Sequence, residues 1–213
     1  MTKQSLKSNN SNLTKKGIIE KLFPFFIIVW LLSCTAVIGA LSMGHVVALP
    51  TVEDSMVSKF KADLLRYQTA ENSTEFVAHI LADDCSCTLS LTRHLLKYGP
   101  RPDSEELILY VGNDKKFEDA ALAAGFSFKA IEATDLLGMG LESAPILAVF
   151  DTEKNLKYVG GYYDHPAAVR PLDQKIRDSL QLTQAIEPLP IFGCATSKRL
   201  QEAFDPLGIV YKS

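Results

Sequence analysis

Two cysteines separated by one serine, Cys85 and Cys87, are the residues of this sequence best suited to chemistry. A pair at this spacing can exchange a disulfide with another thiol, or bind a soft metal such as Cu(I) through two thiolates. It can also be inert, either as two small buried side chains or as a stable disulfide. The spacing alone leaves these alternatives open.

The residues around the pair predict that it lies between a strand and a helix. An apolar run over residues 75–82 precedes Cys85 and predicts a strand that is buried on both faces. After Cys87, apolar residues at helical spacing predict a helix that Gly99 and Pro100 end. In open α/β sheets, ligand and catalytic groups gather at this edge, outside the carboxyl ends of the strands.

Two opposing effects act on the pKa of these thiols. A helix N-terminus stabilises a thiolate and lowers the pKa of a cysteine. Asp83 and Asp84 act in the other direction, because nearby negative charge disfavours a second anion. The sequence does not decide which effect prevails.

Strand and helix patterns alternate along the rest of the chain. The predicted elements are a helix over 56–67, strands over 106–112 and 126–133, a helix over 115–125, a hairpin of 145–151 and 156–163, and a helix around 172–180. This order predicts an α/β domain with a mainly parallel sheet, a terminal β-hairpin and helices on both faces.

The order of these elements resembles the thioredoxin-like superfamily over residues 53–182. In that family a cis-proline opens the first strand of the hairpin and lies beside the redox cysteines, and Pro145, after Ala144, is the matching position. The resemblance implies that Ala144 and Pro145 bind the substrate. The stretch 137–163 is also similar to membrane-tethered thioredoxin-like and peroxiredoxin-like proteins.

The cysteine motif departs from the family pattern. Thioredoxins have two residues between the cysteines and a tryptophan before them, whereas here one residue separates the cysteines and Asp84 precedes Cys85. A disulfide across a single residue closes a smaller ring, and strain in that ring makes the bond more oxidising. The threonine-containing loop that peroxiredoxins use for peroxide is absent from the sequence, so peroxidase activity is not expected.

A membrane anchor is predicted over residues 23–43, which contain no charged side chain. As a helix this segment is roughly 30 Å long, about the thickness of the hydrocarbon core of a bilayer. Five lysines precede it against one acid, which predicts a cytoplasmic N-terminus. A cleaved signal peptide ending near Ala48, and a lipoprotein box at 31–34, are the alternatives.

The predicted organisation follows from the anchor. Residues 1–22 form a basic cytoplasmic tail, 23–43 the transmembrane helix, 44–52 a linker, 53–182 the thioredoxin-like domain, and 183–213 a C-terminal extension that packs on the domain. The localisation expected is a bacterial inner membrane, crossed once, with the C-terminal domain in the periplasm.

Cys194 is a third cysteine outside the membrane segment, in the C-terminal extension. It is either a resolving thiol for the Cys85–Cys87 pair or a packing residue. Gly193 relaxes the backbone beside it, and Thr196 or Ser197 is a candidate cap for a final helix.

The function expected is thiol–disulfide exchange with a thiol or disulfide-containing protein in the periplasm, by a thiol–disulfide oxidoreductase that needs no cofactor or metal. Cys85 is the candidate nucleophile and Cys87 the resolving thiol. The alternatives are a Cu(I) carrier and a thioredoxin-like module that binds partners without turnover. His94 lies two helical turns after Cys87, beyond reach of a shared ion. The net charge of −3, without a basic run in the chain's body, excludes a nucleic-acid partner.

Overall fold

The computed structural model describes residues 23–39, 47–69, 74–83, 85–182, 186–205, 208 and 211. The chain divides into two compact units, Met1–Met43 and Gly44–Ser213. The predicted tail 1–22, the end of the predicted anchor at 40–43 and the start of the linker at 44–46 lie outside the described residues.

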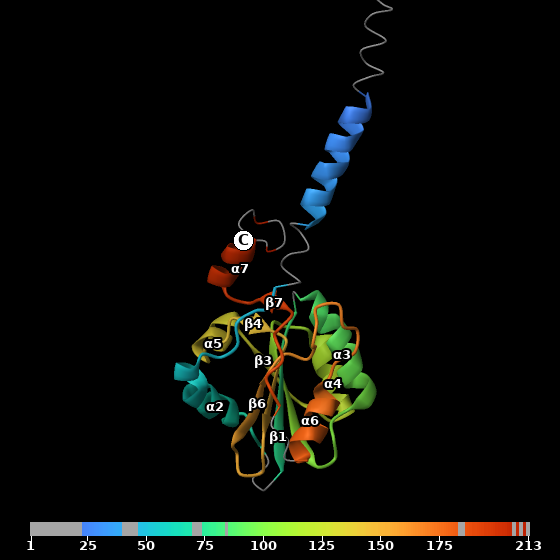
Figure 1. The fold of residues 1–213 in the computed structure, drawn as a ribbon. Coiled ribbons are helices and arrows are strands. Elements are labelled where there is room, and N and C mark those ends of the chain that lie inside the picture. Colours follow the sequence, from blue (N-terminus) through green and yellow to red (C-terminus); the bar gives the residue numbers. More distant parts are fainter. Residues whose placement is uncertain are drawn as a thin grey trace, which may run out of the picture. The chain divides into compact units, whose positions relative to one another are not determined.

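The first unit contains a helix over residues 23–39 (Figure 1). Its large apolar side chains are exposed, Trp30 to 64%. Within the described ranges, no helix reaches both the length and the hydropathy of a membrane-spanning segment.

The second unit is built on a five-stranded sheet with the order β3-β2-β1-β5-β6 (Figure 1). The strands are β1 (Glu75–Ala82), β2 (Ser104–Val111), β3 (Ser127–Ile131), β5 (Ile146–Phe150) and β6 (Leu156–Gly160). The first three are parallel, and β5 and β6 form an antiparallel hairpin that joins β1 through β5. The predicted α/β class, with a mostly parallel sheet, is confirmed.

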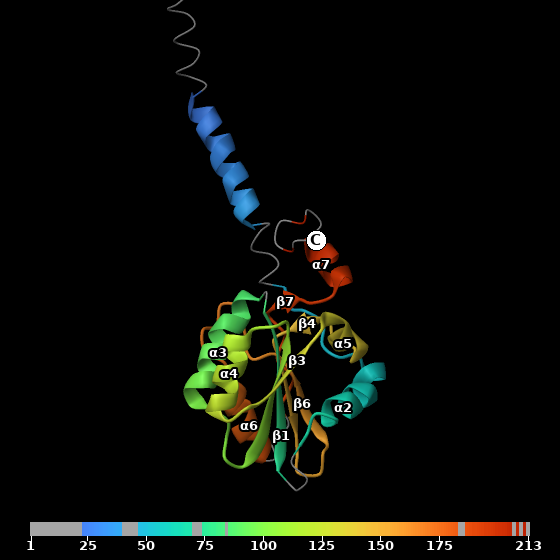
Figure 2. The same cartoon turned by 180° about the vertical axis from the view of Figure 1, so that it is seen from behind.

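Helices cover both faces of this sheet (Figure 2). One face carries α3 (Ser86–Tyr98), α4 (Lys115–Ala124) and α6 (Asp173–Gln181). The other carries α2 (Val57–Leu65), which follows the short 3-10 helix η1 (Asp54–Met56), and α5 (Ala133–Gly138). Successive side chains along a strand point to opposite faces of the sheet. Each face therefore has its own buried hydrophobic cluster.

The third strand is shorter than predicted, because α5 begins where the sequence pattern continues the strand. Glu132 caps α5, and a reciprocal bond between Glu132 and Asp135 forms a capping box. A six-residue helix offers too few turns for an apolar period to be recognised, so the pattern did not predict α5.

Two further short strands form a sheet of their own. They are β4 (Ser143–Ala144) and β7 (Cys194–Ala195), and they pair in antiparallel orientation. After β7 comes α7 (Lys198–Phe204), whose N-cap is Ser197, one of the two predicted caps. Residues that belong to the predicted linker and extension therefore pack in the same unit as the sheet, since Leu49 pairs with Ile191.

A buried polar network ties together the beginnings of β1 and β2 and the helix α6. His79 lies between the hydroxyl of Tyr162 at 2.8 Å and the carboxylate of Glu106 at 3.0 Å. Arg177 donates to Glu106 and, at 2.7 Å, to Glu75. Burial by itself raises the pKa of Glu106, but the hydrogen bond and charge of His79 and the charge of Arg177 outweigh it and lower the pKa to about 2.

Because Glu106 has a lowered pKa in the folded state, its ionisation stabilises the fold above the unfolded pKa and this contribution is lost as pH falls toward 2. We expect Glu106→Gln to lower the free energy of unfolding at pH 7 by about 3 kcal/mol, since Arg177 loses its buried partner. The loss should shrink as pH falls from about 5 toward 2. Chemical denaturation at a series of pH values measures both.

The matched control is Glu118→Gln, which removes a carboxylate whose partner, Lys115, is exposed. We expect a change of less than about 0.5 kcal/mol and no altered pH profile. An equal effect of the two substitutions would contradict the assignment of a stabilising role to the buried network.

Candidate functional site

Cys85 lies where β1 gives way to α3, as the sequence predicts. It is the N-cap residue of α3, with an extended backbone at φ −112° and ψ 116°, and its carbonyl oxygen accepts the N–H of Thr88 at 3.0 Å. Cys87 is the second residue of the helix and is half-buried. The spacing of the pair therefore places one thiol before the helix and the other on its first turn.

Three thiols meet at this point. Cys85 and Cys194 belong to one buried cluster, Cys87 packs against it, and Cys85 Sγ lies 3.8 Å from the carbonyl oxygen of Ala144. Cys85 is only 3% exposed and Cys194 is buried beside it. The structure thus brings together the three cysteines that the sequence analysis selected. Cys85 and Cys87 come from the start of α3, and Cys194 comes from β7 near the C-terminus.

The pairing of β7 with β4 brings Cys194 to Cys85. In this ladder Cys194 faces Ala144, and Ala195 faces Ser143. The peptide bond between Ala144 and Pro145 is cis, as the resemblance implies. The residues predicted to bind a substrate, Ala144 and Pro145, are therefore buried under a segment of the same chain.

Gly193 permits the close approach of β7. A Cβ atom at this position would lie 1.9 Å from the carbonyl oxygen of Ala144 and 2.7 Å from Cδ of Pro145. Any side chain at position 193 would therefore push the backbone of β7 away from that of β4. The sequence shows this glycine only as a flexible neighbour of Cys194, and its packing role is visible only in the fold.

The surroundings raise the pKa of Cys85 to about 11. The hydrogen bond with Cys194 is the largest cause, and burial and the charge of an ionised Cys194 act in the same direction. The hydrogen bond with Cys87 and the backbone N–H of Thr88 lower it, but by less. Cys85 is therefore a protonated thiol at neutral pH while Cys194 lies against it. The helix N-terminus does not prevail here, and Asp84 lies outside the described residues.

Tyr163 borders the thiols and was not selected from the sequence. Burial raises the pKa of its hydroxyl to about 12, and the neighbouring charges of Cys87 and Asp173 add to this effect, while a hydrogen bond with Ser90 opposes it. The sequence pattern placed this residue at the end of a strand. The strand β6 ends at Gly160 instead, which frees the chain to turn toward α3.

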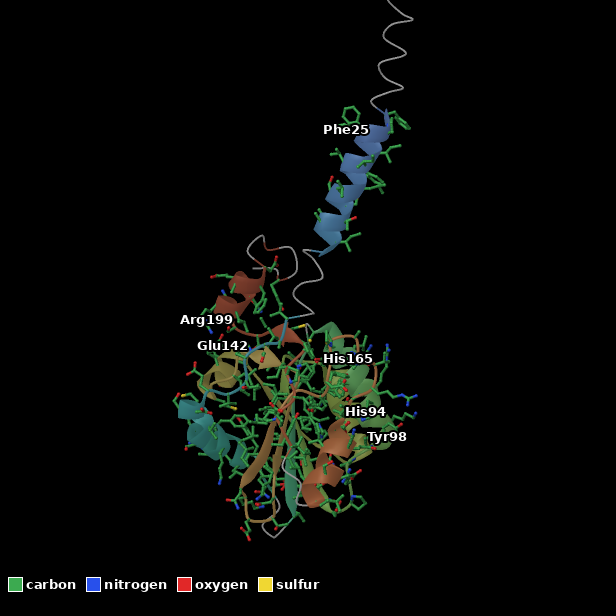
Figure 3. All side chains as sticks on the ribbon, viewed as in Figure 1. Phe25, His94, Tyr98, Glu142, His165 and Arg199 are labelled. Atoms are coloured by element: carbon green, nitrogen blue, oxygen red, sulfur yellow. The ribbon has the colours of Figure 1, made fainter. Side chains whose placement is uncertain are left out.

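His94 is less exposed than a surface helix residue. Its Nε2 lies 3.0 Å from Oδ1 of the buried Asp173, and its ring packs against Tyr98 (Figure 3). Over the described part of the chain, no group of three or more histidine, cysteine, aspartate or glutamate side chains is arranged to hold a metal ion.

We expect Cys194→Ala to lower the pKa of Cys85 from about 11 toward its ordinary value of 9.0, because the largest cause of the increase is removed. The pH dependence of alkylation by iodoacetamide, followed by mass spectrometry of the Cys85 peptide, measures the midpoint independently of accessibility. Cys34→Ala, in the other unit, is the matched control and should leave the midpoint unchanged. An unchanged midpoint in Cys194→Ala would contradict the assigned cause.

Comparisons with known proteins name no family. No family model and no curated protein matches the chain. Similar solved structures include a hypothetical protein from Sinorhizobium meliloti 1021, with 14% identity, a TM-score of 0.46, and coverage of 71% of this chain and 91% of the other. An uncharacterized conserved protein from Geobacillus kaustophilus has 16% identity, a TM-score of 0.43, and coverage of 60% and 78%.

Proposed function

We propose that this protein exchanges thiols and disulfides with a protein partner through Cys85 and Cys87, on a thioredoxin-like domain. The observation that carries the proposal is the contact of Cys85 with two further thiols, at a strand end and a helix start. Cys85 Sγ also lies 3.8 Å from the carbonyl oxygen of Ala144, the residue before Pro145, which is where the resemblance to the thioredoxin-like superfamily implies a proline.

The exchange proceeds in two balanced steps. The Cys85 thiolate attacks one sulfur of a partner disulfide, the partner bond breaks, and the other partner sulfur leaves as a thiolate that takes a proton. Cys87, after losing its proton, then attacks the Cys85 sulfur and releases the first partner sulfur as a second thiol. The partner disulfide is reduced and a Cys85–Cys87 disulfide is formed; the reverse sequence oxidises a partner.

The tether is the second element of the proposal. The helix over 23–39 exposes large apolar side chains, among them Trp30, Leu32 and Phe25, the last of which is labelled in Figure 3. Exposed apolar groups in this density are costly in water and favour insertion in a bilayer. We propose a bacterial inner-membrane anchor over 23–43 that places the thiols in the periplasm.

Substitution of each thiol tests the exchange. We expect Cys87→Ser to accumulate a mixed disulfide between Cys85 and a partner, because the resolving sulfur is missing, whereas Cys85→Ser should trap none. Mass-tagged alkylation and mass spectrometry of the trapped species measure this. In glutathione buffers, the Cys85–Cys87 disulfide should have a reduction potential above about −300 mV. Structural disulfides of secreted proteins lie below this value.

Two outcomes would contradict the proposal. A potential below about −300 mV, with no trapped species in either variant, would make the pair an inert disulfide. Retention of about one Cu(I) per reduced chain, lost in Cys85→Ser and Cys87→Ser, together with absent exchange, would favour a copper carrier.

The anchor is tested separately. We expect the full chain to stay in the membrane fraction after alkaline washing, and a reporter that is active only outside the cytoplasm to be active when fused after Ser213. Replacing Trp30 and Leu32 by lysine should release the protein from membranes, since charge in an anchor costs about 3 kcal/mol per residue. A soluble product that starts near Leu49 would indicate a cleaved signal peptide instead.

A further inference from the structure

The C-terminal segment covers the nucleophile of the proposed exchange. Residues 186–205, here named the strap, run along β6 and then across β4. Its first anchor is at Leu189, whose carbonyl oxygen accepts the N–H of Gly161 at 2.9 Å. Its second is the bridge of Ile191 with Leu49. Cys85 is 3% exposed beneath it, so no partner sulfur can reach Cys85 while the strap is in place.

The backbone pairing of the strap with β4 is short, while the side chains of Ile191, Cys194 and Ala195 are buried in the hydrophobic cluster on this face of the sheet. The ladder has only two residue pairs. Beyond it, Glu142 accepts hydrogen bonds from Ser197 and Arg199, each at 2.8 Å, and its carbonyl oxygen accepts the N–H of Thr196 at 2.8 Å (Figure 3). The Arg199 side chain is 74% exposed, and an exposed ion pair stabilises by less than about 1 kcal/mol. Because the strap also buries apolar side chains, a segment that replaces it has to fill the same space against β4.

Departure of the strap leaves an edge that another strand can pair. The backbone groups of Ser143 and Ala144 lose their partners, and an extended peptide satisfies such groups by adding a strand. The register of β7 shows which peptide fits. Its cysteine faces Ala144 and touches Cys85, and the residue before this cysteine lies against the carbonyl oxygen of Ala144, where a Cβ atom finds no room.

We propose that β4 is the docking edge for an extended partner segment with the sequence Gly-Cys, and that β7 is an internal copy of this segment that shields Cys85 until the partner replaces it. This inference rests on the exchange proposed above. The substrate class is an extended segment in which glycine precedes the cysteine. It is inferred from the close approach of Gly193 to Ala144.

A synthetic peptide tests the docking edge. The probe is the sequence of residues 190–197, Pro-Ile-Phe-Gly-Cys-Ala-Thr-Ser, with its cysteine joined to thionitrobenzoate as a mixed disulfide. The Cys85 thiolate attacks the peptide sulfur, the bond to thionitrobenzoate breaks, and thionitrobenzoate leaves as a coloured thiolate. The full chain carries Cys34→Ser, Cys87→Ser and Cys194→Ser, so that the product stays on Cys85 and no other thiol of the chain competes.

The control peptide has alanine in place of the glycine. We expect the glycine peptide to modify Cys85 about tenfold faster or more, a preference of about 1.4 kcal/mol, because the added methyl group meets the backbone at Ala144. Equal rates for the two peptides would overturn the assignment of a Gly-Cys segment.

Matched glycine variants test the shield. We expect Gly193→Ala to displace β7 and to raise the rate of Cys85 alkylation by iodoacetamide about tenfold, whereas Gly138→Ala, whose Cβ meets nothing within 4 Å, should leave it unchanged. Glu142→Ala loosens the same strap without touching β7 and should raise the rate severalfold. Circular dichroism confirms that each variant is folded. An unchanged rate in both Gly193→Ala and Glu142→Ala would overturn the shield.

A small disulfide separates this inference from the proposed function. If cysteamine–thionitrobenzoate exchanges with Cys85 but both peptides react equally, the exchange stands and the docking edge is wrong. If iodoacetamide modifies Cys85 in Gly193→Ala but no disulfide does, the exchange itself is wrong. If light scattering shows dimers whose Cys194 is disulfide-bonded to Cys85 of the partner subunit, the occupant of β4 is a second copy, which overturns a separate protein partner.

Discussion

The site depends on one backbone contact, the approach of Gly193 to the carbonyl oxygen of Ala144. This approach allows β7 to pair with β4, and the pairing places Cys194 against Cys85. Any side chain at position 193 would separate the two strands. The burial of Cys85 and its contact with Cys194 thus depend on the absence of a single Cβ atom.

The contact also connects the two ends of the second unit. The segment before η1 pairs with the strap through Leu49 and Ile191, and the hydroxyl of Ser143 donates to the carbonyl oxygen of Pro50. The thiols are therefore enclosed by two chain segments that are distant in sequence and that lie outside the main sheet. These segments pack their side chains against one face of the sheet, in the same hydrophobic cluster, without pairing with its strands.

The sheet itself is held rigid toward its other end. There Glu106 and Arg177 form a buried ion pair that His79 and Tyr162 extend, and each charged group has a hydrogen-bonding partner. A fully satisfied network of this kind fixes the relative positions of β1, β2 and α6. Since α3 follows β1 directly, the position of Cys85 on the sheet edge is fixed by the same strands.

The sequence by itself determined the alternation of strands and helices, the place of Cys85 at the start of α3 and the proline after Ala144, because these follow from local periodicity, capping and turn residues. It could not determine that Cys194 meets Cys85, that Gly193 has a packing role, or that α5 and β4 exist. Two-residue strands and a six-residue helix carry no period, and a contact between residues far apart in the chain leaves no local trace. Only the tertiary structure decided these features, because the pKa of Cys85 and its buried contacts depend on which groups the fold brings together.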